Sequence, residues 1–135
     1  MPSNIEATKM LVKRYFEAIE DGDLSTLDEI VAEHYEDRVP GRDPGRAPLK
    51  DAVGSLRTAF PDLRSTVIHI VAEGDLVAVH NRVVGTHLGP MGQLQATGSS
   101  VDFTAFQLFR VDRGMLAEHW EIADEPTLMR QLRGA

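Results

Sequence analysis

The sequence predicts an α+β fold: a cone-shaped α+β barrel, with the N-terminal helices packed in the concave face of a strongly curved, mainly antiparallel sheet. Residues 4–60 carry apolar side chains at helical spacing, interrupted by one loop. Residues 65–124 contain two long β-rich runs, each divided by a turn. Helices followed by strands are typical of α+β domains. The length of 135 residues predicts one domain over residues 1–135.

Three helices are predicted in the first half of the chain. Residues 4–21 place apolar side chains three, four or five positions apart, which is typical of an amphipathic helix. A second, short helix is predicted from Leu24 to about Tyr35. A third covers residues 48–60, and Pro61 ends it because the residue before a proline disfavours helical geometry.

The segment DRVPGRDPGRAP, residues 37–48, is predicted to be a loop, since it holds three prolines and two glycines. Loops of this length in compact domains often border binding sites. Arg42 and Arg46 could attract an anionic group of a ligand. We interpret the stretch around them, GRDPGR, as a solubilising loop.

Two β-hairpins are predicted in the second half. Residues 65–87 turn at EGD and residues 101–124 turn at DRG. A glycine-rich stretch, residues 88–98, joins them. Residues 125–132 are predicted to form a short closing helix, for which Asp124 is interpreted as the N-terminal cap.

The last strand carries the sequence AEHWEIAD, in which neighbouring side chains point to opposite faces of the sheet. His119 and Glu121 therefore share one face with Met115. Trp120 points to the other face, where it packs in the core or at a dimer interface. The polar pair His119 and Glu121 is the first candidate for a functional site.

The preceding strand contributes Gln107 to the same group. With a turn at DRG, Gln107 is expected opposite His119 and diagonal to Glu121. Gln107 either orients a ligand or satisfies His119, because a buried amide needs partners. Apolar side chains surround this group: Phe103, Ala105, Phe109 and Met115. An apolar cavity with a few convergent polar groups is typical of a small-molecule site.

The chain resembles the SnoaL-like polyketide cyclase family, within the nuclear transport factor 2-like superfamily. The matching segments are AFPDLRSTV (59–67), VAEGDLVAVHNRVVGTHLG (71–89), ATGSSVDFTAFQLFRVDRGMLAEHWEIAD (96–124) and the terminal LMRQL. With the first helices they span nearly the whole chain. The resemblance implies a cone-shaped fold and an intramolecular aldol ring closure that needs neither cofactor nor metal.

In these cyclases the aspartate after the tryptophan of HWD is the acid–base catalyst, often with a histidine fourteen residues earlier. This chain has Glu121 and Gln107 at the two positions. Glutamate keeps the carboxylate but moves it by one methylene, whereas glutamine cannot titrate. Family members often read DHxP where this chain has residues 37–40, so Arg38 replaces a histidine near the expected mouth.

These observations lead to the hypothesis of a cofactor-independent acid–base enzyme for a small, largely apolar carbonyl compound. The catalytic candidates are Glu121 and His119. The substrate-binding candidates are Gln107, Tyr15, Phe103, Phe109 and Arg38. Tyr15 is either an oxyanion donor or an ordinary core tyrosine. Aldol cyclisation follows the resemblance, while isomerisation and epoxide hydrolysis could use the same carboxylate.

Two other function classes stay open. The domain could bind a hydrophobic ligand or dimerise without catalysis, or it could be an accessory subunit of an oxidoreductase. The replacements at Glu121 and Gln107 favour such a binding module. A homodimer that packs the outer face of the sheet is expected in either case.

Composition argues against several partners. The net charge of −7 disfavours nucleic acid. The absence of cysteine excludes thiolate metal sites, and the five histidines have neither HxxxH nor HxH spacing, so no metal is predicted. No apolar run approaches the roughly 20 residues of a membrane span. The N-terminus lacks the layout of a signal peptide, so a cytoplasmic location is expected.

Overall fold

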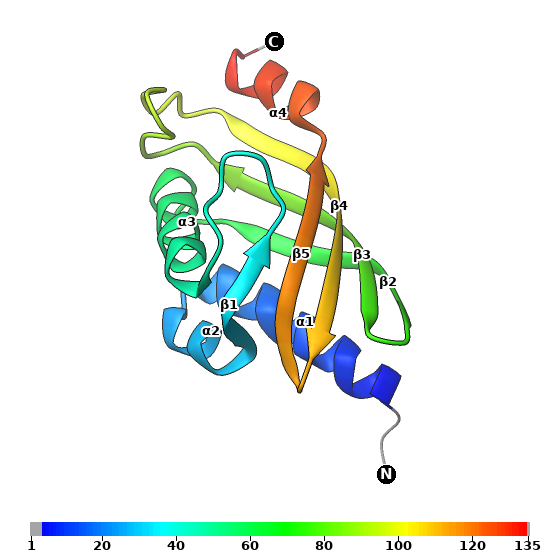
Figure 1. The fold of residues 1–135 in the computed structure, drawn as a ribbon. Helices are drawn as coiled ribbons and strands as arrows, with labels where there is room; N and C mark the ends of the chain where they lie inside the picture. The colour runs from blue at the N-terminus through cyan, green and yellow to red at the C-terminus, as the bar shows by residue number, and fades with distance from the viewer. Residues whose placement is uncertain (1–3, 135) are drawn as a thin grey trace.

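The computed structural model describes residues 4–134, which form helices and one sheet (Figure 1). The elements in chain order are α1 (Asn4–Asp21), α2 (Leu24–Ile30), β1 (Val31–Asp37), α3 (Arg46–Ala59), β2 (Arg64–Glu73), β3 (Leu76–Thr86), β4 (Ser100–Asp112), β5 (Met115–Ala123) and α4 (Glu125–Leu132). The predicted α+β class is confirmed, as are both hairpins and the closing helix. Asp124 caps α4 by accepting a hydrogen bond from the Thr127 amide.

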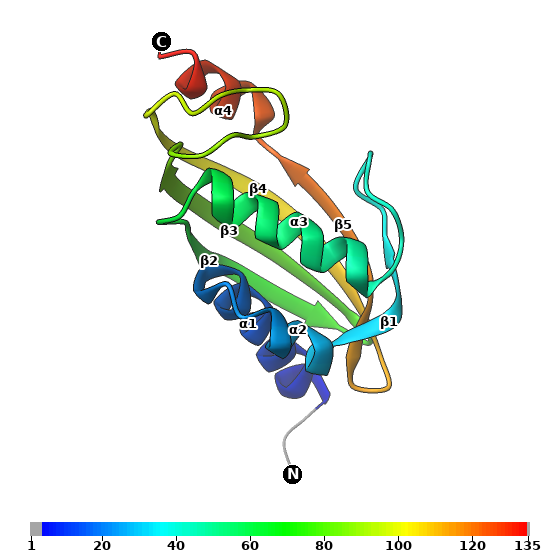
Figure 2. The ribbon, with the colours of Figure 1, turned by 90° about the vertical axis from the view of Figure 1, so that its left-hand side faces the viewer.

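The sheet has the strand order β1-β5-β4-β3-β2, and all neighbours are antiparallel except β1 and β5. It is curled but not closed. Figure 2 looks into its concave side, where α1 and α3 lie in front of the strands. This arrangement confirms the predicted cone-shaped fold.

The second predicted helix is wrong beyond Ile30. Residues 31–37 form β1, which pairs in parallel with β5. Leu27, Ile30 and Tyr35 have spacings that also suit a helix, so the local pattern favoured one. In the structure the backbone adopts an extended conformation at Val31, and β1 pairs with β5, some eighty residues further along the chain. A local sequence pattern does not show such a long-range pairing.

The predicted register of the second hairpin is also wrong. Gln107 pairs with Glu121, and Phe109 pairs with His119. The pairing is therefore displaced by two residues from the one that put Gln107 opposite His119. Gln107 and His119 are diagonal neighbours instead, and both still point to the concave face.

A β-bulge at the start of β5 changes which residue accompanies His119. The pairing of β5 with β4 skips Ala117, and the bulge reverses the alternation of side chains. Leu116 is therefore fully buried in the core, while Met115 is only half-buried. The prediction that Met115 shares the face of His119 is wrong for this reason.

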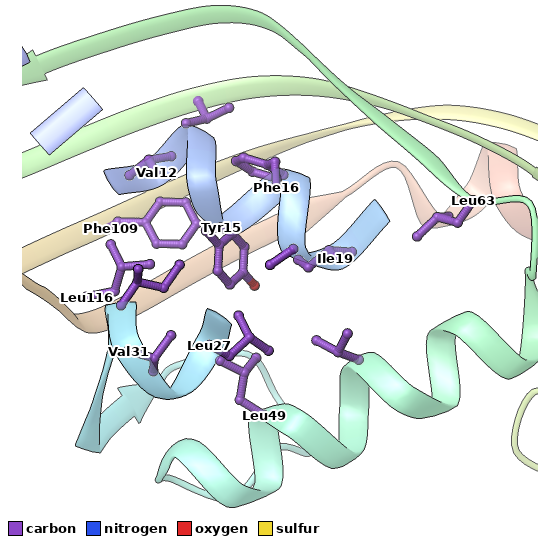
Figure 3. Close-up of a cluster of buried hydrophobic side chains, with 14 of the residues drawn as sticks. Val12, Tyr15, Phe16, Ile19, Leu27, Val31, Leu49, Leu63, Phe109 and Leu116 are labelled. Atoms are coloured by element: carbon purple, nitrogen blue, oxygen red, sulfur yellow. The ribbon is translucent and has the colours of Figure 1, made fainter. Parts of the chain in front are cut away.

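Aromatic side chains of α1 and β4 form the centre of the core. Tyr15 and Phe16 pack edge-to-face against Phe109, with ring centroids 5.1 and 6.1 Å away. Figure 3 shows Tyr15 between Phe109 and Leu27, with its hydroxyl directed away from Phe109. The core thus holds the α1 tyrosine in place while its polar end faces away from the sheet centre.

Candidate functional site

A cavity of about 1010 Å³ lies between the concave face of the sheet, α1, α3, α4 and the segment after β3. Its size matches that of small-molecule sites, which are roughly 300–1,000 Å³. Apolar side chains form much of the wall, including those of Phe16, Val53, Met91 and Phe103. The polar part of the wall includes Tyr15, Arg42, Ser65, Asn81, Gln107 and Glu121.

Buried polar side chains cross the concave face in one line, one from each strand and in the spatial order of the strands. We call this line the polar row; it consists of Asp37, His119, Gln107, Asn81 and Ser65. Nδ1 of His119 lies 3.3 Å from Oδ1 of Asp37, and its Nε2 lies 2.8 Å from Oε1 of Gln107. Nε2 of Gln107 donates to Oδ1 of Asn81 at 3.0 Å, and Nδ2 of Asn81 donates to Oγ of Ser65 at 3.0 Å.

Arg42 brings a positive charge to the β1 end of the polar row. Its Nη1 donates to Oδ2 of Asp37 at 3.0 Å, and its Nη2 lies 3.9 Å from Oε1 of Glu121. The loop turns back toward β1, because the Gly45 amide donates to the Tyr35 carbonyl at 2.6 Å. Gly45 has a φ of 109°, which side chains rarely tolerate. This turn contributes to placing the guanidinium at the cavity.

Asp37 is the charged end of the polar row. Burial alone would raise the pKa of Asp37, but the hydrogen bond from His119 and the charge of Arg42 outweigh burial and hold this pKa below its usual range. Both carboxylate oxygens have partners, since one faces His119 and the other accepts from Arg42. Asp37 therefore acts as an ionised anchor for these two side chains.

Two tyrosines flank His119, with ring centroids 6.2 Å from its ring in both cases. Burial raises the pKa of Tyr15, and the Glu121 carboxylate adds to this rise while Arg42 opposes it. Burial likewise raises the pKa of Tyr35. The Tyr35 hydroxyl is buried and has no hydrogen-bond partner among the described residues. Both side chains are phenols at neutral pH and offer a hydroxyl hydrogen.

The structure brings together most of the residues that the sequence predicts for the site. Glu121, Gln107, Tyr15 and Phe103 line the cavity. His119 and Phe109 are fully buried behind this wall. His119 does not line the cavity itself, but it is hydrogen-bonded to Gln107, which does.

Arg38 lies on the other side of the sheet, so the structure does not support the prediction that it binds substrate. Its Nε donates to Oε2 of Glu118 at 2.8 Å, and its Nη2 pairs with Glu36. Burial alternates over the last three residues of β1, where Tyr35 and Asp37 are buried and Glu36 is exposed. Arg38, which follows Asp37 directly, points outward.

Of the polar cavity residues named above, Arg42, Asn81 and Ser65 were not identified from the sequence. Arg42 was interpreted as part of a solubilising loop, because nothing local shows that the loop folds against β1. Asn81 shares its face of β3 with Val77, Val79 and Val83, whereas His80 points to the opposite face. The alternation of valines along this face of β3 is the signal from which the position of Asn81 on the concave face could have been predicted.

Comparison with known proteins identifies the class of this domain. The SnoaL-like polyketide cyclase model matches residues 9–132. The chain belongs to this family, and its fold is the nuclear transport factor 2-like cone. A comparison with curated proteins finds no match.

Solved structures support the same assignment. IdmH from Streptomyces antibioticus, a candidate polyketide cyclase, is 32% identical, with a TM-score of 0.82 over 93% of this chain and 98% of that chain. TsrD from Streptomyces laurentii is 25% identical, with a TM-score of 0.89 over 96% and 97%. AclR from Streptomyces galilaeus, a candidate hydroxylase, is 26% identical, with a TM-score of 0.85 over 97% and 83%. The fold is therefore shared by proteins described by different activities.

Residues 4–134 contain neither a membrane-spanning helix nor a metal-binding group of side chains. No helix in this range is long and apolar enough to cross a membrane. No three side chains of histidine, aspartate or glutamate in the same range are grouped so that they could hold a metal ion.

Proposed function

We propose that the protein is a cofactor-independent acid–base enzyme that acts on a small, largely apolar carbonyl compound, with Glu121 as the general acid–base. One observation carries this proposal. The Glu121 carboxylate lines the cavity, its side chain is 23% exposed, and no hydrogen bond engages it among residues 4–134. Its lone pairs are free to take a proton from a ligand, unlike those of Asp37.

The reaction that the family supports is an intramolecular aldol closure. Glu121 removes a proton from the carbon next to a carbonyl group, and the resulting enolate oxygen accepts hydrogen bonds from Tyr15 and Arg42. The enolate carbon then attacks a second carbonyl carbon of the same molecule. The new alkoxide takes back the proton from Glu121, so the enzyme is regenerated.

His119 and Gln107 have separate roles in this proposal. Gln107 lines the cavity and contacts the ligand, whereas His119 acts on the ligand indirectly, through Gln107. Isomerisation and epoxide hydrolysis are the alternatives that use the same carboxylate. A binding module without catalysis is the alternative from another class.

Hydrogen exchange at a ketone tests the acid–base step without knowledge of the substrate. α-Tetralone is incubated with the protein in D₂O, and NMR measures deuterium uptake next to the carbonyl. We expect catalysed exchange, and we expect Glu121→Gln to lower its rate by about 10²–10⁴-fold. Glu125→Gln is the matched control, because Glu125 is an exposed carboxylate at the same cavity.

Equal exchange by wild type and Glu121→Gln would contradict the mechanism. Thermal stabilisation by the ketone without any exchange would instead support the binding module.

We also propose that two copies associate through the convex face of the sheet. Phe106 and Ile122 form a cross-strand pair there and are 63% and 79% exposed. Leu108 and Trp120 form the neighbouring pair. Ion pairs flank these rows: Arg82 with Asp102 and Arg110 with Glu118. An apolar centre with a charged rim is typical of a protein interface.

A further inference from the structure

The segment between β3 and β4, residues 87–99, forms one end of the cavity. Figures 1 and 2 show it at the same end of the cone as α4. Met91 of this segment and Leu128 of α4 both line the cavity. Among residues 90–98 only Met91 is half-buried, and its side chain packs against the core, whereas the others are exposed. Met91 is therefore the side chain that this segment directs inward.

Contacts at the start of the segment hold it against α3. The amides of Leu88 and Gly89 both donate to the Ala59 carbonyl, at 3.0 and 3.3 Å. A Cβ atom on Gly89 would lie 2.1 Å from the carbonyl oxygen of Thr58, so only glycine allows this close approach. Thr58 and Ala59 themselves line the cavity, so the segment is fixed at its wall.

His87 joins the two ends of the segment. Its ring is fully buried, and its centroid lies 5.4 Å from that of the Phe60 ring. Nδ1 of His87 accepts a hydrogen bond from the Thr97 amide at 3.2 Å. Met91 pairs with Leu94 through two backbone hydrogen bonds of 2.9 and 3.0 Å. The backbone around Met91 is thus held in place, while its unbranched side chain can adapt to a ligand.

The Glu121 carboxylate lies at a different level of the cavity. Glu121 pairs with Gln107, and Phe103, four residues before Gln107, lines the cavity nearer the start of β4. Four strand residues span about 13 Å. The segment with Met91 leads directly into the start of β4, so Met91 lies toward the Phe103 end. A ligand with its carbonyl group at Glu121 therefore extends its other end toward Met91.

We propose that Met91 is a specificity-determining residue that sets the length of ligand the cavity accepts. The favoured ligand is an elongated ketone, with its carbonyl group at Glu121 and an apolar ring system against Met91. That orientation rests on the proposed function, whereas the place of Met91 in the cavity wall does not.

Two ketones that differ only at the end away from the carbonyl group test this role: α-tetralone and 6-phenyl-α-tetralone. Calorimetric titration of the full-length chain gives the dissociation constant of each. We expect Met91→Ala to shift the ratio of the two constants by about tenfold in favour of the longer ketone, because it opens the end of the cavity. Met91→Trp should shift the ratio by about tenfold in the opposite direction.

Leu94→Ala is the matched control. Leu94 belongs to the same segment and pairs with Met91, but the residues that line the cavity do not include it. The substitution keeps the backbone hydrogen bonds of the pair, so the ratio should stay unchanged.

The orientation is measured separately, by NMR of the chain labelled with ¹³C-methyl methionine. Met91→Ala identifies the Met91 methyl signal by its loss. We expect nuclear Overhauser effects between this methyl group and the phenyl ring of bound 6-phenyl-α-tetralone. Effects to the hydrogens next to the carbonyl group instead would overturn the proposed orientation.

An unchanged ratio in both Met91 variants would overturn the role of Met91, and so would failure of both ketones to bind. No turnover is measured, so the shift in ratio can be observed even if Glu121→Gln leaves ketone exchange unaffected. Failure of this inference and failure of the proposed acid–base function are therefore distinguishable.

Discussion

Arg42 Nη1 donates to Asp37 Oδ2 at 3.0 Å, which fixes a loop side chain to the end of β1 at the wall of the cavity. Arg38, four residues earlier, is bound to Glu118 on the opposite side of the sheet. Two arginines of one short segment are thus divided between the inside and the outside of the cone. This division provides a matched pair of variants.

Arg42→Met should lower the rate of α-tetralone exchange by about 10²-fold, because it removes a cation that stabilises the enolate oxygen. Arg38→Met should leave the exchange rate within about twofold of wild type, since a charge on the convex face does not touch the ligand. NMR-monitored exchange in D₂O provides both rates. Equal losses in the two variants would argue against a role for Arg42 in the cavity.

Asp37→Asn should lower the free energy of unfolding by about 3 kcal/mol at neutral pH, because it leaves the partly buried Arg42 guanidinium and the buried His119 ring without their carboxylate. The pKa of Asp37 is held below its usual range in the folded state, so this stabilisation is present above about pH 4 and is lost as the pH falls further. Urea denaturation at several pH values measures it. A difference between wild type and variant that grows on acidification would contradict the prediction.

Leu116→Ala should cost about 2–5 kcal/mol of stability, since it opens a cavity in the core. Met115→Ala should cost much less, because the bulge turns Met115 away from the core centre. Chemical denaturation of the two variants tests the register directly. The opposite ranking would support regular alternation along β5 without a bulge.

Phe106→Glu should convert a dimer into a folded monomer, because it puts a charge in the apolar centre of the convex face. Met10→Glu is the control: Met10 is 56% exposed on α1, away from the sheet. Sedimentation analysis gives the mass of each variant. A wild-type protein that sediments as a monomer would refute the proposed association.

Much of the fold follows from local signals. The boundaries of α1 and α4, both hairpin turns and the face of Glu121 could be predicted because each depends on residues within one turn or one strand. β1 could not be predicted from local signals, since it pairs with β5. Asp37 of β1 and His119 of β5 are 82 residues apart. The spacing of Ile30, Val31 and Tyr35 suits a helix as well as a strand.

The candidate site could also be predicted only as far as local sequence signals reach. Glu121 and Gln107 were found because alternation along one hairpin places them on one face. Arg42 was missed because a loop carries no periodicity that shows where its side chains point. The bulge at Ala117 accounts for one of the two residues by which the register differs from the predicted one, and it was not predicted because an extra residue in a strand leaves no mark in the apolar pattern.

The polar row takes one side chain from every strand, so it is complete only after all the strands have paired. Its formation therefore depends on the order in which the strands fold. The two hairpins are local and place Glu121, Gln107 and Asn81 together, while the parallel docking of β1 closes the longest loop in the sheet. Until β1 docks, neither Asp37 nor Arg42 is at the cavity. Recovery of ketone exchange after dilution from urea should therefore lag behind the fluorescence of Trp120, which belongs to the second hairpin.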